Sequence, residues 1–116
     1  MISDNNVNSF RNENRIQVRT EREGTRLTIF IKGFMNALTI SKIQETLTDD
    51  ALQDVTELIF DLNETEYMSS FGLRTFLAAQ KKMDEKGGRM VVRGVKSYIM
   101  ELFEMTGFVK ILNIED

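Results

Sequence analysis

The chain changes from strand-like to helical patterning within one short segment, and this change constrains its fold more than any other feature. Leu58–Leu62 is a short apolar run without alternation, which predicts a strand covered on both faces. Between Leu73 and Met83 the apolar residues instead recur at helical spacing. Ser69 and Ser70 therefore stand after a polar break, where a strand gives way to a helix.

Two roles are open for these serines. Unpaired backbone N–H groups and the helix dipole favour an anion at a helix start. Ser69 would cap the helix by accepting a hydrogen bond from the N–H of Phe71 or Gly72, which is worth about 1 kcal/mol. Ser70 would then face outward, where a phosphate could be held. Gly72 has a structural interpretation, because a residue without Cβ lets the helix start lie close to a neighbouring segment.

The remaining chain predicts alternating strands and helices. We expect strands at residues 16–20, 27–31, 58–62, 90–92 and 109–114. We expect helices from Ile40 to Ala51, from the serines to about Lys86, and from a Ser97 cap to Gly107, the last with Tyr98, Ile99, Leu102 and Phe103 on one side. Thr39 or Asn36 is the candidate cap of the first helix. The order β-β-α-β-α-β-α-β predicts an α/β fold with a mixed β-sheet.

Composition limits the classes of function. The 116 residues fit one domain over 15–116, preceded by a polar, Asn-rich segment, 1–14, which we expect to be a flexible tail. A net charge of −3 and scattered basic residues give no reason to expect direct nucleic-acid binding. The absence of His and Cys removes the imidazole base, the thiol nucleophile and the Cys/His zinc site. We therefore expect no enzyme, no metal and no cofactor.

The chain is also expected to be cytoplasmic, without membrane insertion. No stretch approaches the 18 apolar residues of a membrane span. Residues 1–6 lack the apolar core of a signal peptide.

The segment Tyr67-Met68-Ser69-Ser70-Phe71-Gly72-Leu73, preceded by Asp61-Leu62, resembles the signature of the STAS domain family. Its members of the anti-sigma factor antagonist type read Asp-Leu, a few polar residues, and then Asp-Ser-Ser-Gly-Leu or a variant of it. The family fold is a mixed sheet covered mainly on one side by helices. The resemblance thus implies a single STAS-like domain.

The resemblance implies a function as well. An anti-sigma factor antagonist binds an anti-sigma factor that has a kinase-type ATP fold. That kinase phosphorylates a serine, which here aligns with Ser70, and a separate serine phosphatase removes the phosphate. The loop Gly33–Thr39 matches the family loop beside that serine. The implied partner-binding residues are Asn36, Thr39, Ser69, Ser70, Phe71 and Arg74.

The sequence departs from the family pattern at three positions, and these favour an alternative. Asn36 and Ser69 stand where the family often has Asp, so the site is less negative before modification. Phe71 replaces a small residue, and it is either folded inward or exposed as an apolar anchor. The alternative is an unphosphorylated STAS scaffold subunit of a signalling assembly or of a lipid-transport ABC system.

Overall fold

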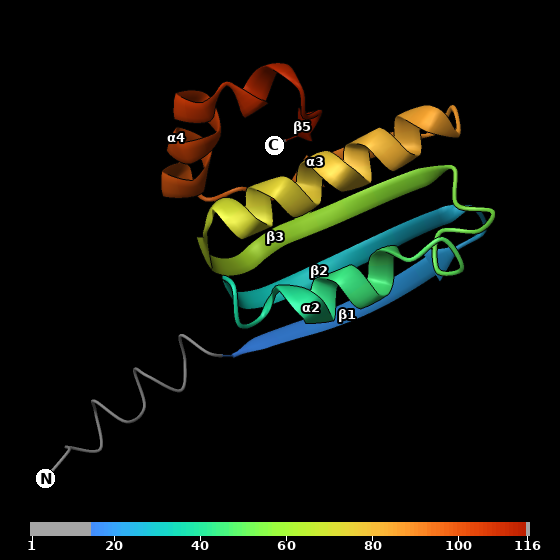
Figure 1. Cartoon of the computed structure of the whole chain (residues 1–116), viewed down its shortest axis with the longest axis horizontal. Helices are drawn as coiled ribbons and strands as arrows, with labels where there is room; N and C mark the ends of the chain where they lie inside the picture. Colours follow the sequence, from blue (N-terminus) through green and yellow to red (C-terminus); the bar gives the residue numbers. More distant parts are fainter. Residues whose placement is uncertain (1–14, 116) are drawn as a thin grey trace, which may run out of the picture.

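A computed structural model describes residues 15–115, and these form a five-stranded sheet with three α-helices (Figure 1). Residues 1–14, which were predicted to be a flexible tail, and the last residue lie outside the described residues. The elements follow in the order β1 (Ile16–Glu23), β2 (Arg26–Met35), α2 (Ile40–Gln44), the 3-10 helix η1 (Glu45–Leu47), β3 (Glu57–Met68), α3 (Ser70–Glu85), β4 (Arg89–Arg93), α4 (Ser97–Thr106), the 3-10 helix η2 (Phe108–Lys110) and β5 (Ile114–Glu115).

The sheet is mixed, as the pattern predicted. Its strands stand in sequence order; β1 and β2 are antiparallel, and each later pair is parallel. The β1–β2 hairpin turns at Gly24, whose φ of 63° lies in the left-handed region that favours glycine. The later strands need crossovers, which the helices supply.

The core lies between one face of the sheet and the helices. Phe60 of β3 stacks on Phe76 of α3 with ring centroids 4.5 Å apart, and Phe76 lies 6.5 Å from Phe103 of α4. In α2, Ile43 is fully buried in the same cluster. Because strand side chains alternate, Phe60 points to the helices whereas its neighbour Asp61 points to the opposite face. The helices therefore pack on one side of the sheet.

The helix predicted over 40–51 is shorter than expected. α2 ends at Gln44 and continues as η1 only to Leu47, after which Thr48 is extended with ψ 160°. The Thr48 hydroxyl accepts a hydrogen bond from the Ala51 N–H at 3.1 Å. Such side-chain-to-backbone bonds compete with helix continuation, which explains the early end.

The strand predicted over 109–114 is wrong for most of its length. Gly107, with φ 79°, ends α4, and the next residues form η2 instead of a strand. The N–H groups of Ile111 and Leu112 both bond to the Phe108 carbonyl, at 3.0 and 2.8 Å. These local bonds occupy the backbone groups that a strand would use, so β5 keeps only Ile114 and Glu115.

Two further differences concern element ends. The N-cap of α4 is Lys96, without a side-chain hydrogen bond, so Ser97 is the first residue of the helix and not its cap. The polar break predicted after Leu62 is in fact strand, since β3 continues to Met68. The buried Thr65 hydroxyl donates to the Ile31 carbonyl at 2.8 Å, which fastens this polar half of β3 to β2.

Candidate functional site

The two serines lie at one corner of the molecule, where β2 and β3 end and α3 begins. The parallel register places Met35, the last residue of β2, opposite Met68, the last residue of β3. The Ser69 N–H donates to the Met35 carbonyl at 2.8 Å. This bond joins the start of α3 to the start of the loop 36–39, so two segments far apart in sequence meet at the corner.

Ser69 is the N-cap of α3, as expected. Its backbone is extended, and its hydroxyl accepts a hydrogen bond from the Phe71 N–H at 3.2 Å. Its carbonyl accepts from Gly72 at 3.0 Å and from Leu73 at 3.2 Å. Because Ser69 supplies the cap, the neighbouring Ser70 is not needed for that purpose, and it is exposed as the first residue of a 16-residue helix.

Gly72 allows the helix start to pack tightly against the strand ends. A Cβ at this position would lie 2.7 Å from Cγ of Met68 and 3.2 Å from Cε of Met35. The lack of a side chain therefore lets α3 begin directly above the two methionines. This close approach fixes the position of the serines relative to the sheet.

Asn36 and Thr39 hold the loop that borders the corner. The Asn36 side-chain oxygen accepts from the Leu38 N–H at 2.9 Å and from the Thr39 N–H at 3.2 Å. The Thr39 hydroxyl accepts from the Asn36 N–H at 3.0 Å and donates to the Phe34 carbonyl. Thr39 is only 3% exposed, so its side chain shapes the loop and offers almost no surface to a partner. Thr39 therefore leaves the set of proposed contact residues.

Phe71 points outward. The residue is 44% exposed, and the Arg74 guanidinium lies 5.8 Å from the centre of its ring. Arg74 is itself exposed, one helical turn beyond Ser70. The corner thus presents a hydroxyl, an aromatic ring and a cation on the first turn and a half of one helix.

Other apolar side chains at this corner were not among the residues singled out from the sequence. Leu38 is 73% exposed, Tyr67 is 47% exposed and Tyr98 is 46% exposed. Tyr67 packs on Phe34 with ring centroids 5.9 Å apart, and the Tyr98 hydroxyl donates to the Glu66 carbonyl. Tyr98 was placed on the buried side of its helix, but in α4 only Ile99 and Phe103 are buried. Tyr98 and Leu102 have the same i, i+4 spacing as Ile99 and Phe103, so spacing alone does not show which of the two pairs is buried.

None of the corner residues singled out from the sequence carries a negative charge. Asn36 and Ser69 are uncharged, and Arg74 contributes a positive charge. The pKa of the Tyr98 phenol is raised by burial and by the Glu66 carboxylate. Tyr98 therefore remains a neutral donor at physiological pH and keeps its bond to the end of β3.

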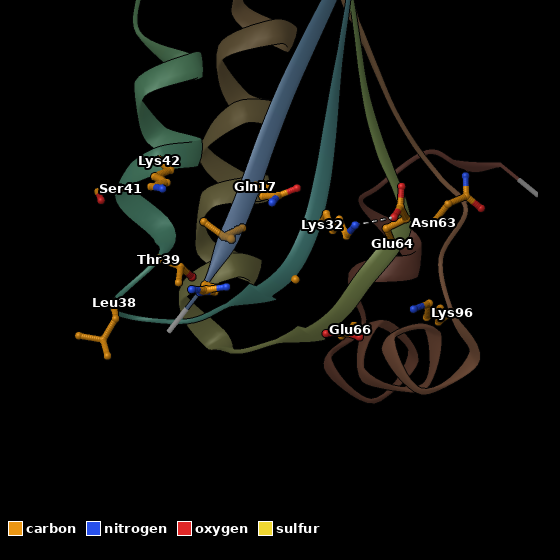
Figure 2. A pocket seen from close by; sticks show the side chains of 13 residues that line it. Gln17, Lys32, Leu38, Thr39, Ser41, Lys42, Asn63, Glu64, Glu66 and Lys96 are labelled. Carbon is orange, nitrogen blue, oxygen red and sulfur yellow. Dashed lines mark ion pairs between the residues drawn. The ribbon is translucent and has the colours of Figure 1, made fainter. Parts of the chain in front are cut away.

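Beside the corner lies an open hollow around the start of β1 (Figure 2). Thr39 and Lys42 border it on one side, and Lys32, Glu64 and Lys96 border it on the other. Lys32 and Glu64 form an exposed ion pair at 3.6 Å. Ser70 and Phe71 do not line this hollow, and no three metal-ligating side chains gather anywhere in residues 15–115.

The first part of the signature, Asp61-Leu62, plays a structural role. Leu62 is fully buried, and Asp61 on the opposite face accepts a hydrogen bond from Arg93 at 3.0 Å. Burial would raise the Asp61 pKa, but hydrogen bonds from the Asn63 backbone and side chain and from Arg93 together lower it. Asp61 is thus held as a carboxylate that joins β3 to β4.

Comparisons with known proteins agree with this architecture. The sequence profile of the STAS domain family matches residues 16–116. An anti-sigma-B factor antagonist of Listeria monocytogenes is 32% identical over 96 residues, which cover 83% of this chain and 84% of the relative. No helix in the described residues is long and apolar enough to cross a membrane.

Solved structures share the fold. An anti-sigma factor antagonist from Mycobacterium paratuberculosis superposes with a TM-score of 0.73 at 20% identity, covering 87% of this chain and 86% of that one. The Bacillus cell fate determinant SpoIIAA, in its phosphorylated form, superposes with a TM-score of 0.69 at 16% identity, covering 86% and 92% of the two chains.

Proposed function

This chain belongs to the STAS domain family, and from that premise we propose that it is a cytoplasmic anti-sigma factor antagonist controlled at Ser70. In the unmodified state it binds an anti-sigma factor with a kinase-type ATP fold and so releases a sigma factor. That kinase phosphorylates Ser70, and a separate serine phosphatase reverses the reaction. The chain itself carries out no chemistry.

The observation that carries this proposal is that Ser69 caps the helix while the neighbouring Ser70 is exposed and is not needed as a cap. Ser69 caps α3, while the exposed Ser70 keeps its place at the positive end of the helix dipole. A phosphate on Ser70 adds almost two negative charges and three acceptor oxygens. Its neighbours on the helix, the exposed Phe71 ring and the Arg74 guanidinium, belong to the same surface.

Phosphate at this position would act on binding rather than on the fold. An interface built around Phe71 requires desolvation, and a dianion beside the ring makes that desolvation costly. An acidic partner surface would in addition be repelled. The partner surface that we propose consists of Asn36, Ser69, Ser70, Phe71 and Arg74, together with the exposed side chains of Leu38, Tyr67 and Tyr98.

The experiment measures binding of Ser70 variants to the kinase-type anti-sigma factors of the same organism. We expect Ser70→Asp to weaken binding and Ser70→Ala to leave it unchanged, because only the first variant carries the negative charge of the phosphate. Gln53→Asp is the matched control, since it adds one negative charge at an exposed residue outside the proposed partner surface. Mass spectrometry after incubation with kinase and ATP then locates the phosphate. Equal binding by all three variants would reject the switch.

A second candidate function is the unphosphorylated STAS scaffold subunit of a signalling assembly or of a lipid-transport ABC system. It is favoured by Asn36 and Ser69, which replace acids that a kinase could read, and by the bulky exposed Phe71. The gene neighbourhood separates the two: a kinase-like anti-sigma gene supports the antagonist, and a transporter operon supports the scaffold.

A further inference from the structure

The outer edge of the sheet carries a strand whose second side is open. β1 is the first strand in the sheet order, and no strand within residues 15–115 pairs with its outer side (Figure 1). Six of its eight residues are exposed. An exposed edge strand presents a row of unpaired N–H and C=O groups that can pair with another chain.

The register shows which backbone groups face this edge. The Arg15 carbonyl accepts from the Phe34 N–H at 3.2 Å, and the β1–β2 register continues from Ile16 opposite Gly33. Antiparallel residues alternate between hydrogen-bonded and non-hydrogen-bonded pairs. The odd-numbered residues of β1 therefore bond to β2, whereas Val18, Thr20 and Arg22 direct their N–H and C=O groups outward.

The charged side chains of β1 can pair with the opposite charges on β1 of a second copy. Arg19 and Glu21 flank Thr20, and both side chains are 61% exposed. Arg19 lies on the face of the sheet away from the helices, with its guanidinium 3.9 Å from the centre of the Phe30 ring. The two form an ion pair within the strand. Such an exposed ion pair contributes little to the stability of the fold. Replacing it with ion pairs between two chains therefore costs little free energy.

Two copies of β1 can meet in one favourable register. With a two-fold axis at Thr20, Arg19 of each copy lies opposite Glu21 of the other, so the pair forms twice. With the axis moved to Arg19 or to Glu21, like charges lie directly opposite one another, which is destabilising. Of the alignments centred on Val18, Arg19, Thr20 or Glu21, only the one at Thr20 places Arg19 opposite Glu21, so the charge pattern of β1 favours this alignment.

We propose that β1 is a homodimerisation strand, pairing antiparallel with β1 of a second copy about a two-fold axis at Thr20. The contact is isologous, so the same residues serve on both copies. It joins the two sheets into one continuous sheet. Thr20 lies opposite Ile29, well before the end of β2 at Met35, so both Ser70 corners remain free.

Sedimentation equilibrium of the full chain, from micromolar to millimolar concentration, tests this proposal. We expect a concentration-dependent dimer. Arg19→Glu and Glu21→Arg should each weaken it by about tenfold or more, because two attractive cross-strand pairs become two repulsive ones. An equimolar mixture of the two variants should recover a heterodimer, since positions 19 and 21 again carry opposite charges across the interface.

Two further variants separate this interface from other causes. Thr20→Pro removes an outward N–H group without removing a bond to β2, so it should abolish the dimer while the circular dichroism spectrum stays unchanged. Lys81→Glu on α3 makes the same change of charge away from the edge and should leave dimerisation unaffected. A wild-type chain that stays monomeric at millimolar concentration overturns the proposal. So does a dimer that is insensitive to Arg19→Glu and Thr20→Pro, or a mixture of folded variants that does not associate.

Discussion

The two halves of β3 have different surroundings: the first half lies in the core, and the second half leads to the proposed partner surface. Leu58–Leu62 is buried throughout. The second half, from Asn63 to Met68, is exposed except at Thr65 and Met68, and it ends at the Ser70 corner. β4 pairs with β3 only as far as Asp61, so beyond that residue β3 has β2 as its single neighbouring strand.

The first half of β3 packs in the core, and the second half lies at the surface next to the start of α3. In the first half, Phe60 packs under α3 and Asp61 is held by Arg93 on the other face. In the second half, the loss of β4 leaves Tyr67 on the surface, next to the capped start of α3. The buried half of β3 is fixed in the core, and the exposed half leads from it to the corner. Substitutions in the two halves should therefore have different consequences.

The largest effect is expected in the buried half. Phe60→Ala removes a fully buried ring from the contact with Phe76 and leaves a cavity. We expect the free energy of unfolding to fall by about 3–5 kcal/mol. Urea denaturation followed by circular dichroism measures it. A loss of less than about 1 kcal/mol would show that the first half of β3 does not anchor the core.

The next effect concerns binding at the start of α3, directly after the second half of β3. Phe71→Ala should weaken binding to the anti-sigma factor by about 2 kcal/mol or more, as an interface anchor does, with little change in the melting temperature. Calorimetry for binding and thermal unfolding for stability give the two quantities. Glu85→Ala, at the exposed far end of α3, is the matched control. If Phe71→Ala changes neither quantity, this corner is not an interface.

A smaller effect on stability is expected at Ser69, where β3 gives way to α3. Ser69→Ala removes the hydrogen bond to the Phe71 N–H and should lower the free energy of unfolding by about 1 kcal/mol. Ser70→Ala should change it much less, because the Ser70 hydroxyl does not serve as the cap. The reverse order of the two losses in denaturant unfolding would contradict the assignment of the cap.

The smallest expected effect is a pH dependence in the buried half. The pKa of Asp61 is lowered in the folded chain from its ordinary value of 3.8. Its contribution to stability is therefore present above that pH and is lost as the pH falls through the lower folded pKa. Denaturant unfolding at several pH values should show wild type exceeding Asp61→Asn at neutral pH, with the gap closing in acid. A gap that is independent of pH would disprove this contribution.

Much of this architecture could be predicted from local pattern. The alternation in β1 and β2, the apolar run Leu58–Leu62 and the helical spacing after Ser70 all report a backbone period, which a sequence displays directly. The same holds for Ser69, because capping requires only a hydroxyl at the right offset from two N–H groups. Gly72 followed from the same reasoning, since only a missing Cβ permits the contact with Met68.

The local sequence pattern did not predict which individual side chains are exposed. Phe71 could have faced inward or outward, and Thr39 resembled a surface residue although its hydroxyl is used within the loop. Tyr98 carries the same apolar signal as Ile99, but it is 46% exposed whereas Ile99 is buried. For Phe71 and Tyr98 the outcome depends on which distant segment packs alongside, and neighbouring residues do not encode that.

By itself, the sequence determined the periods, the cap and the order of strands and helices, because each depends on residues a few positions apart. The tertiary structure decided where strands end and what the corner displays. β3 extends through its polar residues because β2 offers Ile31 as a partner for Thr65, and η2 replaces a strand because Phe108 satisfies the backbone locally. These choices rest on long-range pairing and burial, which exist only once the chain has folded.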